Sequence, residues 1–295
     1  MKCTLFFLFF LLKAAAEGIA KQQRYAIVKP NTNISETLFY QPGSLKLKDL
    51  MFFDCNAQIG NTVKGAGAGV QELIAEMDRT GVDYALVRHA NLATDGCAVA
   101  NAALAEMLKS DTAKRLYGVW GILPEQCDEL PAGDELFEAM RRNRIKALTL
   151  DPENHRFVAC RLTIGKIMDA AAERKIPVLL NNIKTWKAIY DFMQEFPRIY
   201  AVVNAGFKWG SDRNIRPLLE HYPNLYAELG GYWVPEGVRD LAEKYGSTRI
   251  LYGSMYPAGQ LGCGMLQIKH SGLDARAVAD IAGLNLKKLL EDAVI

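Results

Sequence analysis

Short apolar runs alternate with helix-like segments along the chain after Leu50, and this alternation restricts the fold more than any other feature. The runs are Met51–Cys55, Tyr84–Val87, Tyr117–Leu123, Lys146–Leu150, Pro177–Leu180, Tyr200–Val203, Leu225–Leu229 and Ile250–Gly253. Strands that alternate with helices are parallel and joined by right-handed crossovers. Strands that are apolar throughout are typical of a sheet buried on both faces.

Between these runs lie segments with helical spacing of apolar residues, such as Leu73, Ile74 and Met77. The predicted helices are Glu72–Arg79, Val99–Leu108, Glu135–Arg141, Gly165–Arg174, Thr185–Glu195, Ile215–His221, Val238–Tyr245 and a last one near Ala275–Leu290. Eight strand-helix units predict an α/β fold, a single (β/α)8 TIM-barrel domain over residues 51–295. The glycines at 65, 67 and 69 do not have the spacing of a dinucleotide-binding loop.

Residues 1–50 are predicted to form an amino-terminal extension. Met1-Lys2 and the apolar run Leu5–Leu12 have the charge and short core of a secretory signal, and the alternative is a helix over Thr4–Ala20. The run is shorter than the roughly 20 apolar residues that cross a bilayer, so no transmembrane segment is expected. The lysine at position 13 and six scattered cysteines without a CxxC pair favour the helix and a reducing compartment. We therefore expect a cytoplasmic rather than a secreted protein.

The charge balance excludes some classes of partner. The formal net charge is +2, from 35 basic and 33 acidic residues, so nucleic acid and anionic membranes are not expected as partners. Half of the residues are hydrophobic, which suffices for a large core. The expected partner is a small-molecule ligand or substrate. The sequence does not decide whether the chain forms a homo-oligomer.

Two carboxamides mark the end of the first predicted strand. Asn56 and Gln58 are one residue apart and therefore lie on the same side of a strand. A mononuclear metal hydrolase would carry histidines at such a pair, because neutral imidazoles on one face converge on one ion.

Several segments in this order resemble the amidohydrolase-related family, a branch of metal-dependent hydrolases and decarboxylases built on a distorted barrel. The resemblance covers about residues 51–290 and depends on Asp54–Gly60, Thr80–Asp83, Tyr117–Gly121, Ile176–Asn181, Tyr222–Tyr226, Arg249–Pro257 and Asn285-Leu286. It implies the same barrel fold and hydrolase or decarboxylase chemistry.

The chain departs from the family at every metal-binding position. The family's His-x-His corresponds to Asn56 and Gln58, and its later histidines correspond to Asn181 and Asn204. The aspartate that serves the family as metal ligand and general base corresponds to Met255. Carboxamides are poor zinc ligands, and without the ion no bound water has its pKa lowered to about 7. We therefore predict no metal and no cofactor.

Two residues at the predicted mouth are candidate proton carriers. Glu228 lies in an otherwise apolar strand, where a carboxylate is costly unless it is paired or faces a pocket. Its alternative role is a hydrogen-bond anchor for the glycine turn that follows. His89, at the end of the second strand, could be a general base or a structural histidine.

Other residues near the mouth have competing interpretations. Asp151 suits a turn as well as the pocket. Cys55, expected to point away from Asn56, is interpreted as a small core residue. Lys208 and Trp209 could bracket an anionic or flat ligand or belong to a solvated loop, and Trp186 is expected to pack its helix rather than stack on a ligand.

These observations give two hypotheses for function. In the first, Asn56, Gln58, Asn181, Asn204, Met255 and Asp151 bind a small polar or carboxylated metabolite, which Glu228 or His89 helps to hydrolyse or decarboxylate without metal. In the second, the chain is an inactive pseudoenzyme that serves as a binding or oligomerisation scaffold, with the carboxamides bonded to one another. A pocket where Glu228 and His89 converge would favour the enzyme, and one packed shut by Met255 and Tyr256 would favour the scaffold.

Overall fold

A computed structural model of the protein describes residues 50–60, 68–206 and 211–295. The interpretations of the amino-terminal extension before Leu50, of the glycine-rich first loop and of Lys208 and Trp209 therefore lie outside the described residues.

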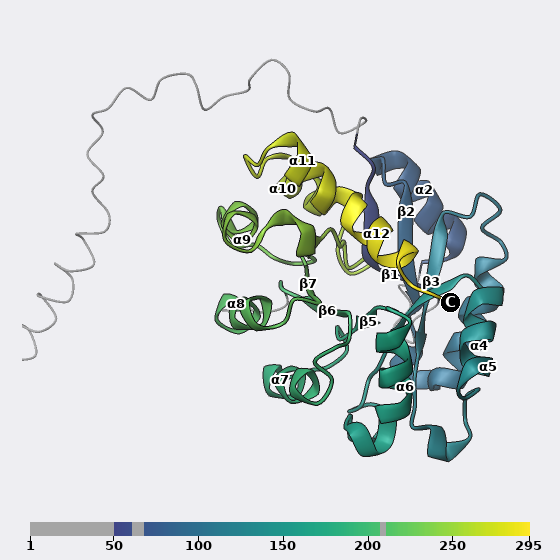
Figure 1. Cartoon of the computed structure of the whole chain (residues 1–295). Coiled ribbons are helices and arrows are strands. Elements are labelled where there is room, and N and C mark those ends of the chain that lie inside the picture. Colours follow the sequence, from purple (N-terminus) through teal and green to yellow (C-terminus); the bar gives the residue numbers. More distant parts are fainter. Residues whose placement is uncertain (1–49, 61–67, 207–210) are drawn as a thin grey trace, which may run out of the picture. The chain divides into compact units, whose positions relative to one another are not determined.

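Eight parallel strands form one sheet in which each strand pairs with its neighbours in sequence. The strands are β1 (Phe53–Ile59), β2 (Tyr84–His89), β3 (Leu116–Gly121), β4 (Ile145–Thr149), β5 (Val178–Leu179), β6 (Ala201–Asn204), β7 (Leu225–Glu228) and β8 (Ile250–Leu251). The backbone N–H of Cys55 donates to the carbonyl of Tyr252 at 3.0 Å, which brings the first and last strands together. The result is the nearly closed (β/α)8 barrel that the sequence predicts (Figure 1).

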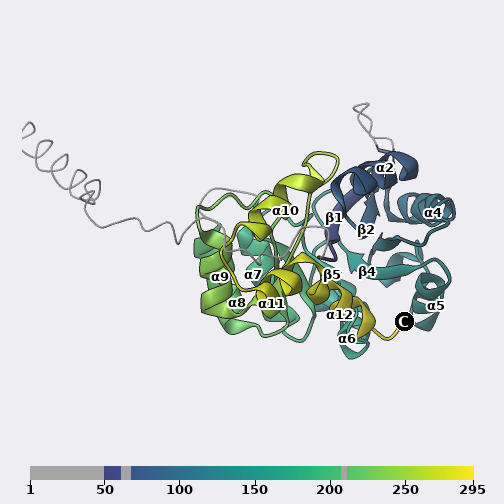
Figure 2. The same cartoon turned by 90° about the horizontal axis from the view of Figure 1, so that it is seen from above.

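The helices surround the strands (Figure 2). They are α2 (Val70–Thr80), α3 (Leu92–Asp95), α4 (Cys97–Leu108), α5 (Asp134–Arg142), α6 (Arg161–Glu173), α7 (Trp186–Glu195), α8 (Asp212–His221), α9 (Gly237–Tyr245), α10 (Leu261–Lys269), α11 (Ala275–Ala279) and α12 (Asn285–Glu291). Two short 3-10 helices, η3 (Glu125–Cys127) and η4 (Ser247–Arg249), and a π-helix, η5 (Asp280–Leu284), complete the set in the described residues. Every helix predicted after residue 50 is present, but α3 and α10 were not predicted. In α10, Gly262 and Gly264 weaken the helical signal because glycine disfavours a helix. None of these helices is long and apolar enough to cross a membrane.

The core has two layers separated by the strands. The inner layer fills the barrel with one or two side chains from most strands, namely Phe53, Cys55, Leu86, Val119, Ala147, Leu179, Val202 and Leu251, and α12 adds Leu286, Leu289 and Leu290. The outer layer packs the opposite strand faces against the helices. Cys55 is fully buried in the inner layer, which confirms its interpretation as a core residue.

An irregularity in β1 decides which of its side chains face the interior. The register with β2 shifts between Asp54 and Ala57. Before the shift Cys55 belongs to the inner layer, whereas after it Ala57 and Ile59 belong to the outer layer. A bulge of this kind re-aims the residues that follow it. Asn56 therefore turns inward together with Cys55, and the prediction that the two point in opposite directions is wrong.

The carboxylate of Asp54 reinforces the closure between β1 and the segment after β8. Its Oδ1 accepts hydrogen bonds from the backbone N–H groups of Asn56 at 3.0 Å and Ser254 at 2.9 Å, and its Oδ2 accepts one from the Ser254 hydroxyl. Burial raises the pKa of Asp54, and these hydrogen bonds act against the rise.

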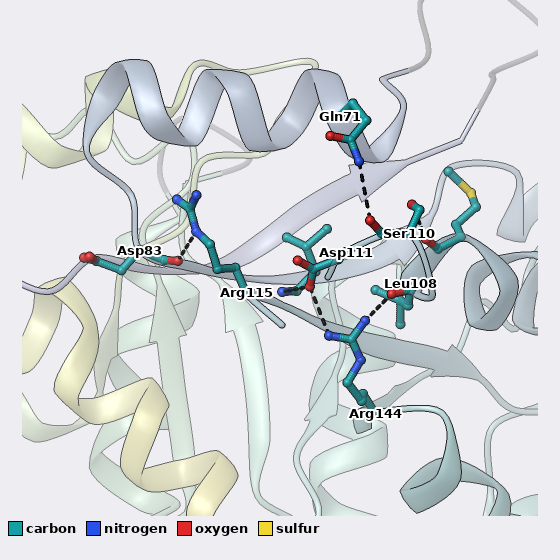
Figure 3. Close-up of polar contacts among 9 residues, drawn as sticks. Gln71, Asp83, Leu108, Ser110, Asp111, Arg115 and Arg144 are labelled. Carbon is teal, nitrogen blue, oxygen red and sulfur yellow. Dashed lines mark hydrogen bonds and ion pairs between the residues drawn. The ribbon is translucent and has the colours of Figure 1, made fainter. Parts of the chain in front are cut away.

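A second buried carboxylate orders the amino ends of the strands (Figure 3). Asp111 accepts hydrogen bonds from the backbone N–H of Leu116 at 2.8 Å and from Arg144 Nη1 at 3.0 Å, and its side chain is fully buried. Arg144 also donates to the carbonyl of Leu108 at the end of α4. This ion pair ties the connection between α4 and β3 to the start of β4.

Candidate functional site

A cavity of about 810 Å³ lies at the carboxyl ends of the strands, where barrel enzymes carry their sites. Most of the predicted site residues line it, and each lies at or just after the end of a strand: Gln58, His89, Asp151, Asn181, Asn204 and Met255. Arg88, Asn154, Asn182, Lys184 and Trp186 also contribute to the wall. Asn56 and Glu228, in contrast, lie beneath this surface.

Glu228 is the centre of a buried hydrogen-bond network under the cavity. Its Oε2 accepts from Asn56 Nδ2 at 2.9 Å and from Asn204 Nδ2 at 2.5 Å, and its Oε1 accepts from the backbone N–H of Gly230. Burial raises the pKa of Glu228 to about 7, while the bonds from Asn204, Gly230 and Asn56 act in the opposite direction. Glu228 therefore holds the glycine turn, and Asn204, one of its two asparagine partners, lines the cavity.

Gly253, just after β8, leaves space for the Glu228 carboxylate because it has no side chain. A Cβ atom at position 253 would lie 1.9 Å from Glu228 Oε1, so any side chain there would displace the carboxylate. The glycine in the Tyr252-Gly253 segment is thus required by the close approach of the backbone to this carboxylate.

Arg88 is the main functional candidate that sequence reasoning missed. Its Nη1 donates to Asn56 Oδ1 at 2.7 Å, so Asn56 bridges Arg88 on one side and Glu228 on the other. Within the described residues no carboxylate forms an ion pair with Arg88. Burial lowers the pKa of Arg88, while the nearby carboxylates of Glu228, Asp151 and Asp54 act in the opposite direction, and a guanidinium remains protonated in proteins. The available signal was the spacing from Leu86, because residues two apart on a strand share a face and Leu86 points inward.

The four carboxamides fall into two pairs. Asn56 and Asn204 are fully engaged, since Asn204 also donates to the Gly230 carbonyl at 2.9 Å and accepts from the Gly206 N–H at 3.1 Å. In contrast, both polar atoms of the Asn181 side chain are buried without a hydrogen-bond partner in the described structure. The Gln58 side chain likewise makes no hydrogen bond to another described residue and lines the cavity. The predicted self-satisfied network exists for the first pair only, and its hub is a carboxylate.

His89 lines the cavity and is half-buried. Its Nδ1 accepts from the backbone N–H of Asn91 at 3.3 Å, and burial lowers its pKa, so the ring is neutral near pH 7. Glu228 does not line the cavity and no hydrogen bond joins it to His89, so the two predicted proton carriers do not converge. The cavity is nevertheless open beside Met255, and neither of the two predicted arrangements occurs in full.

The rim combines turn structure with polar groups. Asp151 accepts from the backbone N–H of Asn154 at 3.3 Å and from its Nδ2 at 2.7 Å, so it forms the predicted turn while lining the cavity. Lys184 Nζ donates to Asn154 Oδ1 at 3.0 Å. Trp186 begins α7, packs partly against the outer core and also forms part of the cavity wall.

The residues that the resemblance places at the family's metal positions do not fit a divalent transition metal. The Asn56 oxygen already faces the Arg88 cation, and the Asn56 and Asn204 amide nitrogens donate to Glu228. Met255 supplies only a thioether, whereas zinc is bound through imidazole, thiolate or carboxylate groups. Across the described ranges no group of three or more His, Cys, Asp or Glu side chains is placed to hold a metal ion.

Comparison with known proteins agrees with this architecture. The sequence model of the family described as amidohydrolase matches residues 58–291. No curated protein matches the chain.

Solved structures share the fold at low sequence identity. Amidohydrolase 2 from Bifidobacterium longum subsp. infantis is 14% identical, with a TM-score of 0.60 over 82% of this chain and 99% of that one. 5-Carboxyvanillate decarboxylase from Sphingomonas paucimobilis is 12% identical, with a TM-score of 0.62 over 82% and 99% of the two chains. A 5-carboxyvanillate decarboxylase from Novosphingobium aromaticivorans, solved with manganese and 3-methoxy-4-hydroxy-5-nitrobenzoic acid bound, is 12% identical, with a TM-score of 0.61 over 83% and 98%.

Proposed function

The chain belongs to the amidohydrolase family, and from this premise we propose that it is a divergent member that binds a small carboxylated metabolite without the family's metal centre. The family and its decarboxylase neighbours support a hydrolase-like or decarboxylase-like barrel. The proposed step beyond this is that an arginine supplies the positive charge that an ion would otherwise provide.

The observation that carries the proposal is the chain of hydrogen bonds from Arg88 through Asn56 to Glu228. Asn56 is neutral, so it fixes the guanidinium without cancelling its charge. Arg88 lines the cavity and keeps its remaining N–H groups for an incoming anion. A guanidinium matches a carboxylate through two parallel hydrogen bonds, which gives both affinity and orientation.

The other cavity residues support the same class of ligand. Lys184 adds a second positive charge at the rim, and Gln58 can donate to or accept from a polar group of the ligand. Fixed donors of this kind stabilise negative charge that develops on a substrate during hydrolysis or decarboxylation. His89, neutral and in the wall, is the group best placed to exchange a proton with the ligand. Glu228 acts from below by positioning Asn56 and Asn204.

Ligand binding without turnover is the second candidate function, favoured by Met255. By the resemblance this residue corresponds to the family's catalytic aspartate; it lines the cavity, yet it can neither accept a proton nor hold a charge. Without a carboxylate at position 255, proton transfer would fall to other titratable groups of the wall, such as His89 or Asp151.

Thermal unfolding with a panel of small mono- and dicarboxylates tests the proposal. A ligand of the folded state at about 100 times its Kd stabilises the protein by about 2.7 kcal/mol, so at least one carboxylate should raise Tm in the presence of a chelator. Arg88→Met should abolish this shift. Arg79→Met is the matched control, because Arg79 pairs with Glu76 on the exposed side of α2 and should leave the shift unchanged. Turnover of the stabilising compound, followed by loss of substrate, distinguishes the enzyme from the binding protein.

Two results would overturn the proposal. One is a Tm shift that persists in Arg88→Met, and the other is stoichiometric zinc or manganese whose removal eliminates the response to ligand.

A further inference from the structure

An unusual layer of aromatic residues fills the barrel at the amino ends of its strands. Phe53 belongs to the inner core, and Tyr84, Tyr117, Tyr200 and Tyr226 pack partly buried against it. Barrel interiors are ordinarily filled by branched aliphatic side chains. Tyrosines in this layer place phenol groups where an ordinary core would have none.

Part of this layer borders a second cavity, of about 330 Å³, between the first four strands and α12. Phe53, Tyr84, Tyr117 and Lys146 come from β1, β2, β3 and β4 in turn, and Leu290 of α12 forms another part of the wall. The Phe53 ring centroid lies 5.4 Å from that of Tyr84 and 5.8 Å from that of Tyr117, and the two tyrosine centroids are 6.4 Å apart. The three rings thus form a continuous aromatic wall. A cavity of this size is at the lower end of the range for small-molecule sites, about 300–1,000 Å³.

The charge of this cavity is positive. Lys146 is partly buried on β4, and within the described residues it has no carboxylate partner. The other lysine of the wall, Lys287, is paired with Glu291. The hydroxyls of Tyr84 and Tyr117 have no hydrogen-bond partner among the described residues, and burial raises the pKa of Tyr117, which therefore stays protonated as a donor. The wall thus combines aromatic faces with one uncompensated cation and two phenol donors.

We propose that this amino-end cavity is a second ligand site, which binds a small planar aromatic monoanion such as an arene carboxylate. The aromatic body of the ligand packs against Phe53, Tyr84 and Tyr117, because offset or edge-to-face ring pairs with centroids about 4.5–7 Å apart are favourable. Its anionic group pairs with Lys146 in a partly buried setting, where such a pair is less screened by salt than at the surface.

The site is independent of the cavity that contains Arg88. The inner core layer, which includes Leu86, Val119 and Leu179, fills the barrel between the two ends. No residue lines both cavities.

Calorimetric titration of the full chain with 2-naphthoate tests the proposal, and the Arg88→Met background removes the carboxyl-end cation first. We expect this variant to bind one 2-naphthoate, and Lys146→Met added to it to weaken binding at least tenfold. Lys146→Arg should stay within about threefold of the parent, since it keeps the positive charge. The neutral 2-naphthamide should bind at least tenfold more weakly than 2-naphthoate and should not respond to Lys146→Met.

Lys288→Met is the matched control on α12, because Lys288 pairs with Asp292 and does not line the cavity. If Lys146→Met fails to fold, Lys146→Gln replaces it and should show the same loss. The proposal is overturned if 2-naphthoate does not bind to Arg88→Met at millimolar concentration, or if it binds with an affinity that neither Lys146 variant changes. Because every titration is made without Arg88, failure here leaves the function proposed for the carboxyl-end cavity untouched.

Discussion

Arg88 and Arg144 lie at opposite ends of the barrel strands, and each is linked to a buried carboxylate in a different way. Arg144 bonds directly to Asp111 at 3.0 Å, so the two charges compensate each other. Arg88 is separated from Glu228 by Asn56, which accepts from one and donates to the other. The direct pair stabilises the structure and leaves no charge for a ligand. The bridged pair holds Arg88 through one hydrogen bond to a neutral amide, and the remaining N–H groups of Arg88 have no hydrogen-bond partner among the described residues.

The largest expected effect is on the direct pair. Arg144→Met leaves Asp111 buried without its cation, and breaking a buried pair from one side costs about 3–5 kcal/mol. Because Arg144 is partly exposed, we expect a loss near 3 kcal/mol in urea unfolding. The double variant Arg144→Met with Asp111→Asn should recover part of the loss. A loss below about 0.5 kcal/mol would mean that the pair behaves like a surface salt bridge.

Glu228, the carboxylate that Asn56 links to Arg88, should make the folding stability depend on pH in a defined direction. Its pKa is about 7 in the folded protein against an ordinary value of 4.5, so between these values the folded state binds more protons than the unfolded state. Stability therefore falls as pH rises from 4.5 to 7, and the full cost, about 3 kcal/mol, is present above pH 7. Urea unfolding at pH 5 and pH 8 should show most of this loss in the wild type and a much smaller one in Glu228→Gln. Glu243→Gln, at an exposed position of α9, should match the wild type, and equal slopes in all three proteins would refute the assignment.

Converting the bridged site into a direct pair tests the comparison itself. Asn56→Asp places a carboxylate against Arg88, as Asp111 stands against Arg144. We expect carboxylate affinity to fall about 10- to 100-fold, because the guanidinium charge is then compensated and about 1.4–2.7 kcal/mol of binding is lost. Titration calorimetry with the compound found by thermal unfolding measures the change. Unaltered affinity would show that Arg88 does not hold the ligand's anion.

The smallest expected effect distinguishes the engaged carboxamides from the unengaged ones. Asn181→Leu removes two buried polar atoms that lack partners and should raise stability by about 1 kcal/mol. Asn56→Leu should lower it, because Glu228 and Arg88 each lose a hydrogen bond. Thermal unfolding of the two variants at one pH makes the comparison, and a loss of stability in Asn181→Leu would contradict the interpretation.

Much of the site could be anticipated because the carboxyl ends of parallel strands meet at one end of a barrel. That rule alone brings Gln58, His89, Asn181, Asn204 and Met255 around one cavity. It could not reveal the inward turn of Asn56, which depends on a register shift in β1. Nor could it place Glu228 beneath the cavity wall, since the depth of a side chain depends on its neighbours from other strands.

The sequence by itself determined the architecture, because apolar periodicity and glycine and proline positions are local signals that repeat in every strand-helix unit. Through the family resemblance it also predicted carboxamides and a methionine at the positions of the metal ligands. Only the tertiary structure decided which of these groups are already bonded. Asn56 and Glu228 are 172 positions apart. Whether a carboxamide is hydrogen-bonded within the protein or remains available to a ligand depends on contacts over such separations. The role that we propose for Arg88 depends on the same long-range contacts, since Asn56 accepts from Arg88 and donates to Glu228.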